Sequence, residues 1–130
     1  MSKSILIADD NVSVRRVVRR WLESRGLTVC GEAADGLEAI QKVSELRPDL
    51  ILLDLAMPKL NGAAAASVIR KLMPKLPIIL FTMYEDAVDS LASAVGVDMV
   101  LSKPDGINNL VERVEHLLDS NQNGARALRE

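Results

Sequence analysis

The chain has 130 residues, 48% of them hydrophobic and 26% charged, and its formal net charge is −2. One domain with an ordinary core accounts for these values, which exclude a disordered chain and give no reason to expect a surface that coats nucleic acid. The single cysteine, Cys30, excludes an internal disulfide, and no apolar run is long enough for a signal peptide or a membrane span, so we expect a soluble cytoplasmic protein.

Short apolar runs alternate with amphipathic segments in the first half of the chain. Residues 4–8 are continuously apolar, which predicts a strand buried on both faces. Residues 14–22 carry apolar side chains at the spacing of a helix that faces a core, and residues 27–31 form a weaker strand. A second helical pattern covers residues 35–47 and ends before a proline.

The second half of the chain repeats this alternation. Strands are predicted at residues 49–55, 78–82 and 98–102, and helices at residues 63–72, 85–95 and 107–118. Five strand–helix repeats predict an α/β fold, a doubly wound parallel sheet with right-handed crossovers. We expect one domain over residues 1–119 and a polar, frayed tail over residues 120–130.

Charged and polar residues stand at the predicted strand ends. The first strand runs into Asp9 and Asp10, the third carries Asp54, the fourth ends at Thr82 and the fifth ends at Lys103. Ligands of open α/β sheets bind beyond the carboxyl ends of the strands, where the strand order reverses. With the strand order 2-1-3-4-5, all five side chains meet at one rim of the sheet.

This set of residues suits phosphoryl chemistry at a metal site. Carboxylate oxygens are the ligands that Mg²⁺ takes, and the metal would offset repulsion among Asp9, Asp10 and Asp54. A carboxylate can form an acyl phosphate, which makes Asp54 the natural nucleophile. The ammonium of Lys103 and the hydroxyl of Thr82 could each contact a phosphoryl oxygen.

The chain resembles the receiver domains of bacterial two-component response regulators. The resemblance lies in five features: "ADD" at 8–10, "LLDLAMP" at 52–58, Gly62, "FT" at 81–82 and "SKP" at 102–104. Within that family, "GEAADG" and "TMYED" are most similar to the NarL-like branch. The resemblance implies a flavodoxin-like (βα)5 fold and a role in phosphorelay signal transduction as a phosphoprotein.

The resemblance also implies a role for each site residue. Asp54 matches the phosphoacceptor, Lys103 the lysine that contacts the phosphoryl group, and Thr82 the switch hydroxyl. The Mg²⁺ ligands that it implies are Asp9, Asp10, Asp54 and the backbone carbonyl of Ala56. The peptide bond between Lys103 and Pro104 is a candidate for the cis form. The domain would catalyse its own phosphorylation and dephosphorylation and would not be a metabolic enzyme.

Partners follow from the same resemblance. We expect a histidine kinase or phosphotransfer protein as phosphoryl donor and an unidentified output protein that binds the face formed by helix four, strand five and helix five. A phosphorylation-dependent homodimer is possible, and direct nucleic-acid binding is not expected. The family usually has Tyr or Phe three residues before the lysine, where this chain has Val100, so we expect switching to pass through Thr82 and Tyr84 instead.

Several alternatives stand beside this interpretation. The chain could be the receiver portion of a longer DNA-binding regulator, or a Mg²⁺-dependent phosphatase with an aspartyl nucleophile, although Ala56 stands where such enzymes need a second acid. A flavin-binding electron carrier would need a Ser/Thr-rich phosphate loop after the first strand. Taken alone, Asp10 or Asn11 could merely cap the first helix. We expect the arginines of that helix to form a solvated face; the alternative is a docking surface for a kinase or another acidic partner.

Overall fold

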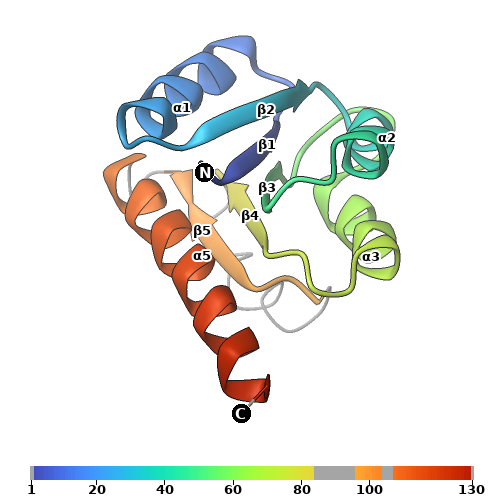
Figure 1. The fold of residues 1–130 in the computed structure, drawn as a ribbon. Coiled ribbons are helices and arrows are strands. Elements are labelled where there is room, and N and C mark those ends of the chain that lie inside the picture. Colours follow the sequence, from blue (N-terminus) through green and yellow to red (C-terminus); the bar gives the residue numbers. More distant parts are fainter. Residues whose placement is uncertain (1, 84–95, 104–106, 130) are drawn as a thin grey trace.

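The computed structural model describes residues 2–83, 96–103 and 107–129 (Figure 1). The predicted helix at 85–95, together with Tyr84 and Pro104, lies outside the described residues, as does the Lys103–Pro104 peptide bond. Within the described part, no helix combines the length and the apolar character that a membrane span requires.

Five parallel strands form one sheet in the order β2-β1-β3-β4-β5, which confirms the predicted doubly wound topology. The strands are β1 (Ser4–Ala8), β2 (Thr28–Ala33), β3 (Leu50–Asp54), β4 (Ile78–Thr82) and β5 (Met99–Ser102). Every residue of β3 and β4 is buried, as expected for central strands covered on both faces. The order reverses between β1 and β3, which places the switch point where Asp9 and Asp54 leave the sheet.

The described helices cover both faces of the sheet (Figure 1). They are α1 (Val12–Ser24), α2 (Gly36–Leu46), α3 (Gly62–Leu72) and α5 (Ile107–Arg129). Side-chain oxygens of Asn11, Asp35 and Asn61 accept hydrogen bonds from backbone N–H groups in the first turns of α1, α2 and α3. These caps satisfy donors that a helix cannot pair internally, so α1, α2 and α3 each begin at a defined residue.

Strand alternation divides the core into two layers. Leu6, Ile51 and Leu53 pack with residues of α2 and α3 on one face. Ile5 and Leu52 pack with α1 and α5 on the other face. Successive strand side chains point to opposite faces, so the continuous apolar runs supply both layers at once.

The C-terminal helix is longer than the sequence predicted. We expected a helix at residues 107–118 and a frayed tail over residues 120–130, whereas α5 spans Ile107–Arg129. Residues 125–129 read Ala-Arg-Ala-Leu-Arg, all good helix formers, although two asparagines and Gly124 precede them. The domain boundary at residue 119 and the fraying of the tail stay predictions.

Candidate functional site

Three carboxylates meet at the carboxyl ends of β1 and β3. One oxygen each from Asp9, Asp10 and Asp54 lies within 4.8 Å of the other two. Asp9 and Asp54 are only 3% and 6% exposed, whereas Asp10 is exposed to solvent. Parallel strands deliver their ends to the same edge, so residues 45 positions apart become neighbours.

The turn after β1 fixes the first acid of the cluster. The backbone N–H of Asn11 donates to Oδ1 of Asp9 over 2.9 Å, and the backbone N–H of Asp9 donates to the carbonyl of Ala33 over 2.9 Å. Asn11 also caps α1, because its Oδ1 accepts from Ser13 and Val14. Asn11 is therefore the cap, and the alternative role of Asp10 as the N-cap of α1 does not apply.

Lys103 joins the cluster from β5. Its Nζ lies 2.8 Å from Oδ2 of Asp9 and 3.2 Å from Oδ1 of Asp54. The same ammonium lies 5.8 Å from the centre of the Phe81 ring, within the range of a cation–π contact. The lysine thus offsets part of the negative charge that the buried acids concentrate.

Burial and mutual repulsion set the protonation of this cluster. Burial raises the pKa of Asp54 to about 6, with a further upward contribution from Asp9 and an opposing one from Lys103. Burial alone would lower the pKa of Lys103, but its hydrogen bond to Asp9 and the charges of both aspartates raise it above its ordinary value. The ammonium is therefore charged at neutral pH, and Asp54 is a carboxylate that ionises with difficulty.

A cavity of about 370 Å³ opens over the acids. Its walls include the three aspartates and Lys103, and also Ala56 and Met83. Thr82 does not line this cavity: it is completely buried at the end of β4, beside Ser102 of β5 in the sheet register. The cavity thus brings together the three aspartates, Ala56 and Lys103, and Thr82 lies buried beside them, one residue beyond the partner of Asp54 in β4.

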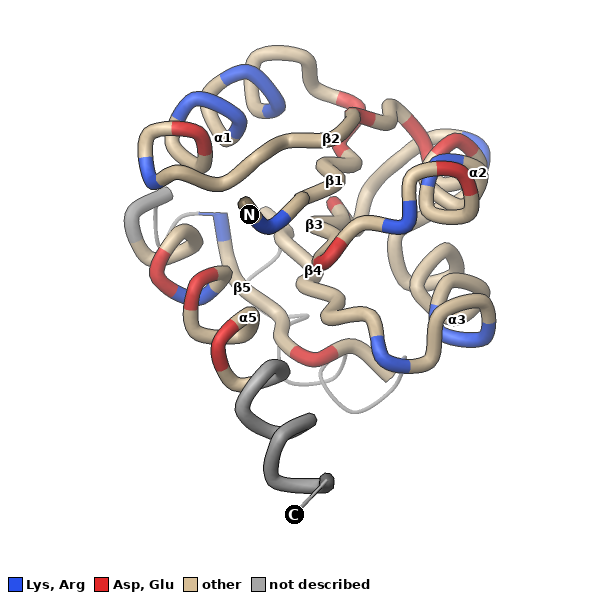
Figure 2. Tube along the Cα trace, in the orientation of Figure 1, with Lys and Arg blue, Asp and Glu red and all other residues tan. Residues whose placement is uncertain are grey.

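Arg15 is a supporting residue that the sequence did not single out. Its Nη1 donates to the backbone carbonyl of Asp9 over 2.6 Å, and its Nε donates to Glu32 of β2 over 2.8 Å. Arg19 also contacts Glu32, over 2.8 Å. Although partial burial alone would raise it, hydrogen bonds from both arginines hold the pKa of Glu32 below its ordinary value. The expected solvated arginine face of α1 (basic residues blue in Figure 2) is therefore wrong for Arg15, whose side chain is 16% exposed, but not for Arg19, which is 37% exposed.

The loop after β3 depends on a close backbone approach. The N–H of Gly62 donates to the carbonyl of Leu55 over 2.8 Å. A Cβ atom at residue 62 would lie 2.1 Å from the carbonyl oxygen of Asp54, which is far inside contact distance. Only glycine allows α3 to begin so close to Asp54.

The chemistry of the donor set fits a divalent cation. Three carboxylates supply hard oxygen atoms with more negative charge than the single Lys103 ammonium offsets. Such ligands suit Mg²⁺, which keeps several waters and needs solvent access. Asp10 is exposed and the cavity is open above it, so the site meets that requirement as well.

Comparison with protein families identifies this arrangement. Residues 5–115 match the model of the response regulator receiver domain. The chain is 34% identical over 113 residues to the chemotaxis protein CheY of Thermotoga maritima, with 86% of this chain and 94% of that protein covered. It is also 36% identical to the response regulator MprA of Mycobacterium ulcerans, with 91% of this chain and 51% of MprA covered.

Solved structures give the same result. The response regulator TrrA of Thermotoga maritima, in complex with Mg(2+)-BeF, superimposes with a TM-score of 0.81 at 32% identity, over 88% of this chain and 98% of that chain. The present chain spans 51% of the length of MprA, and 38% and 25% of the length of two other curated relatives that it matches.

Proposed function

Because the chain belongs to the response regulator receiver domain family, we propose that Asp54 accepts its phosphoryl group. The chain is a receiver domain of two-component response regulators. One observation carries the proposal: Asp54 ends the central strand β3, buried, with the Lys103 ammonium 3.2 Å from its Oδ1. The alternatives of a flavin carrier and of a phosphatase receive no support from the relatives.

The proposed reaction transfers a phosphoryl group from a phosphohistidine. An oxygen of Asp54 attacks the phosphorus, a P–O bond forms as the P–N bond breaks, and the departing imidazole takes a proton from solvent. With a pKa of about 6, most of Asp54 is ionised at neutral pH and can act as nucleophile. Lys103 would hold a phosphoryl oxygen by a charge-assisted hydrogen bond.

We further propose that the acid cluster holds Mg²⁺. The residues that would bind it are Asp9, Asp10, Asp54 and the backbone carbonyl of Ala56, all of which line one cavity. When bound, the metal would offset carboxylate repulsion and withdraw charge from the phosphoryl group. The Mg(2+)-BeF complex of the relative TrrA supports this assignment.

A phosphoryl donor would dock beside α1. Val17 and Trp21 lie one helical turn apart and are 40% and 42% exposed, so together they present neighbouring apolar surface on α1. A groove of about 320 Å³ runs from Val17 to Lys103, past Phe81 and Met83. This apolar surface leads to the acid cluster, so we propose that a histidine kinase or phosphotransfer protein binds over it.

Thr82 would carry the signal away from Asp54. Its hydroxyl group is buried next to the site, and Val100 is a buried core residue packed toward α2 and α3. A β-branched side chain has few rotamers, so Val100 cannot swing between two poses as a large aromatic ring can. We therefore propose that Thr82 moves on phosphorylation and changes the binding of an output protein; a homodimer of the phosphorylated chain is one such complex.

A longer DNA-binding regulator remains a second candidate context for this domain. The match to MprA covers 51% of that regulator, so similar domains occur as part of longer chains. The receiver chemistry proposed for Asp54 is the same in both contexts.

The test of the phosphoacceptor is chemical. The protein is incubated with acetyl phosphate and Mg²⁺, and its intact mass is measured. We expect one phosphoryl adduct in the parent protein and in the control Asp119→Asn, which removes an exposed aspartate of α5, and none in Asp54→Asn. An undiminished adduct in Asp54→Asn would contradict the proposal.

A further inference from the structure

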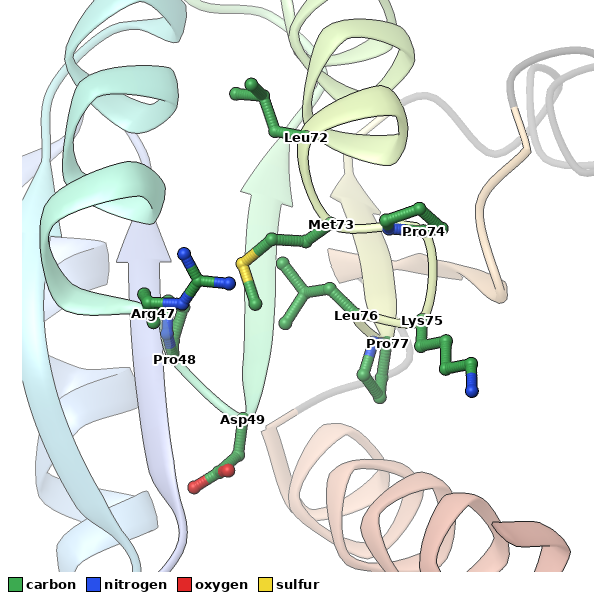
Figure 3. Close-up of a pocket in the computed structure, with 9 residues that line it drawn as sticks. All are labelled: Arg47, Pro48, Asp49, Leu72, Met73, Pro74, Lys75, Leu76 and Pro77. Carbon is green, nitrogen blue, oxygen red and sulfur yellow. The ribbon is translucent and has the colours of Figure 1, made fainter.

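A groove lies between the ends of α2 and α3, at the edge of the sheet opposite the acids (Figure 3). Its volume is about 390 Å³, which is large enough for one or two bulky side chains. We propose that this groove binds a short acidic segment of a partner protein that also carries a large apolar side chain. The proposal does not depend on phosphorylation of Asp54.

The groove has an apolar lining. Met73 and Leu76 both extend toward Arg47 in Figure 3, and Leu72 stands above them at the end of α3. Leu72 is 48% exposed, and Leu46, in the last turn of α2, is 41% exposed. Exposed apolar side chains beside a hollow of this size are typical of an interaction site rather than of a solvated surface.

The charges of the groove select an acidic partner. The guanidinium of Arg47 extends toward Met73 and Leu76 in Figure 3, and Lys75 stands on the opposite wall. Neither side chain makes an ion pair or a hydrogen bond within the part of the chain that the structure describes. The acid in the wall, Asp49, accepts hydrogen bonds from the N–H of Ser4 over 2.7 Å and from its hydroxyl over 3.2 Å. The rim of the groove therefore carries two cations without partners among the described residues, whereas its one carboxylate, Asp49, is already engaged.

The backbone of Arg47 supplies an independent argument. Arg47 ends α2 in the left-handed conformation, with φ 46° and ψ 64°. Glycine or asparagine adopts this conformation at lower energy at the end of a helix. A left-handed residue is a common end for a helix, and here the N–H of Arg47 donates to the carbonyl of Val43, so the unexpected feature is an arginine where glycine would cost less. We infer that the arginine side chain serves recognition.

The groove is also held in shape before any partner binds. Arg70 of α3 donates from Nη1 to the carbonyls of Pro74 and Leu76, over 2.9 and 2.8 Å, and from Nη2 to Asp98 over 2.8 Å. Asp98 in turn accepts from the N–H of Ile78, over 2.7 Å. One arginine thus fixes the loop between α3 and β4 against the start of β5. A preformed groove loses little conformational freedom on binding.

The experiment titrates ¹⁵N-labelled protein with capped synthetic pentapeptides and follows the amide chemical shifts. The probe is Asp-Leu-Asp-Phe-Asp; the controls are Lys-Leu-Lys-Phe-Lys and Asp-Ala-Asp-Ala-Asp. We expect the probe to shift amides of residues 46–49 and 72–77, more weakly as salt is added, and both controls to leave them unchanged. Equal shifts with the lysine peptide, or no shifts at this groove, would overturn the proposal.

Variants separate recognition from folding. Arg47→Gly removes the charge and relieves the backbone strain, so we expect an equal or higher melting temperature and about tenfold weaker peptide binding. Lys75→Gln should also weaken binding, whereas Arg20→Ala removes an exposed arginine of α1 and should not. Unchanged binding in Arg47→Gly, or shifts at the groove that depend on protein concentration without peptide, would show that the occupant is not an acidic segment.

Discussion

Nζ of Lys103 lies 2.8 Å from Oδ2 of Asp9, and both side chains are nearly buried, with 12% and 4% of their surface exposed. The two residues stand 94 positions apart, at the ends of β5 and β1. This ion pair joins the two strand ends across the site, and the charge of Lys103 compensates two buried carboxylates at once. Removal of this ammonium therefore measures how much the repulsion among the buried carboxylates destabilises the fold.

We expect Lys103→Met to lower the free energy of unfolding at pH 7 by about 3 kcal/mol, because two buried carboxylates lose their partner. The matched control is Lys59→Met, which breaks an ion pair of 3.5 Å between an exposed lysine and Asp35; since Asp35 also accepts from the N–H of Glu38, the loss should cost less than about 1 kcal/mol. Urea denaturation without Mg²⁺ measures both. Equal stability of the two variants would show that the Lys103 pair contributes little.

Asp54 should make the metal-free protein less stable as the pH rises. Its pKa of about 6 lies above the ordinary value of 3.8, so the folded state binds the proton more tightly than the unfolded state. The resulting stability is fully present below 3.8 and is lost as the pH rises through 6. We expect Asp54→Asn to lack this loss and to be about 1–3 kcal/mol more stable than the parent at pH 7.

Urea unfolding at pH 4.5 and pH 7.5, in the presence of EDTA, tests this prediction. Asp119→Asn serves as a control, because its carboxylate is exposed. A parent protein and Asp54→Asn with the same pH dependence would contradict the raised pKa of Asp54.

Asp10 should contribute to metal affinity and detract from the stability of the metal-free protein. Its carboxylate lies within 4.8 Å of those of Asp9 and Asp54, and crowded like charges repel. We expect Asp10→Asn to weaken Mg²⁺ binding at least about tenfold, as loss of a direct ligand does. The same variant should raise the melting temperature without metal. Mg²⁺ titration followed by amide shifts measures the affinity, and parental affinity in Asp10→Asn would remove Asp10 from the ligand set.

The fold was predictable from sequence wherever apolar runs were long and sharply bounded. The predicted strands at residues 4–8 and 78–82 coincide with β1 and β4. The second strand was predicted at residues 27–31 but extends from Thr28 to Ala33. Its mixed composition gives no clear end, and pairing of Ala33 with Ala8 of β1 sets the boundary instead. The apolar pattern therefore predicts the bounds of these two inner strands, whereas pairing with β1 sets the end of the edge strand β2.

The acid cluster could be predicted because the strand order tells which strand ends, distant in the sequence, lie side by side in the sheet. Asp9, Asp10, Asp54 and Lys103 all follow strands, and strand ends share one edge. The role of Arg15 could not be predicted in this way. Its hydrogen bond to the carbonyl of Asp9 depends on the direction of the side chain at the start of α1. The sequence does not distinguish this arginine from the others on the polar face of the same helix. Supporting contacts of this kind can be identified only in the three-dimensional structure.

Arg15 and Arg19 offer a matched test of that support. Both contact Glu32, but only Arg15 reaches the carbonyl of Asp9. We expect Arg15→Gln and Arg19→Gln each to cost about 1 kcal/mol of stability. Only Arg15→Gln should also weaken Mg²⁺ binding, because it frees the turn after β1, which carries the proposed ligands Asp9 and Asp10. Equal Mg²⁺ affinities in the two variants would show that Arg15 contributes to stability but not to metal binding.

Gly62 should be the glycine least tolerant of a side chain near the site. A Cβ at residue 62 would meet the carbonyl oxygen of Asp54 at 2.1 Å, and neither backbone can move without shifting β3 or α3. Gly31 provides the control: its Cβ would clash with the Cδ1 methyl of Leu46, at 2.7 Å, and would make an ordinary contact with Cδ1 of Leu6, at 3.5 Å. Leu46 is 41% exposed and can rotate away.

We therefore expect Gly62→Ala to lower the free energy of unfolding by more than about 2 kcal/mol, and Gly31→Ala to change it by less than about 1 kcal/mol. Because the clash is with the residue proposed to accept the phosphoryl group, any Gly62→Ala protein that folds should also be phosphorylated more slowly by acetyl phosphate than Gly31→Ala. Denaturation curves and the time course of the intact mass measure the two effects. A stable Gly62→Ala protein with parental phosphorylation would mean that the loop after β3 adapts without moving Asp54, and that the placement of Asp54 does not depend on this backbone contact.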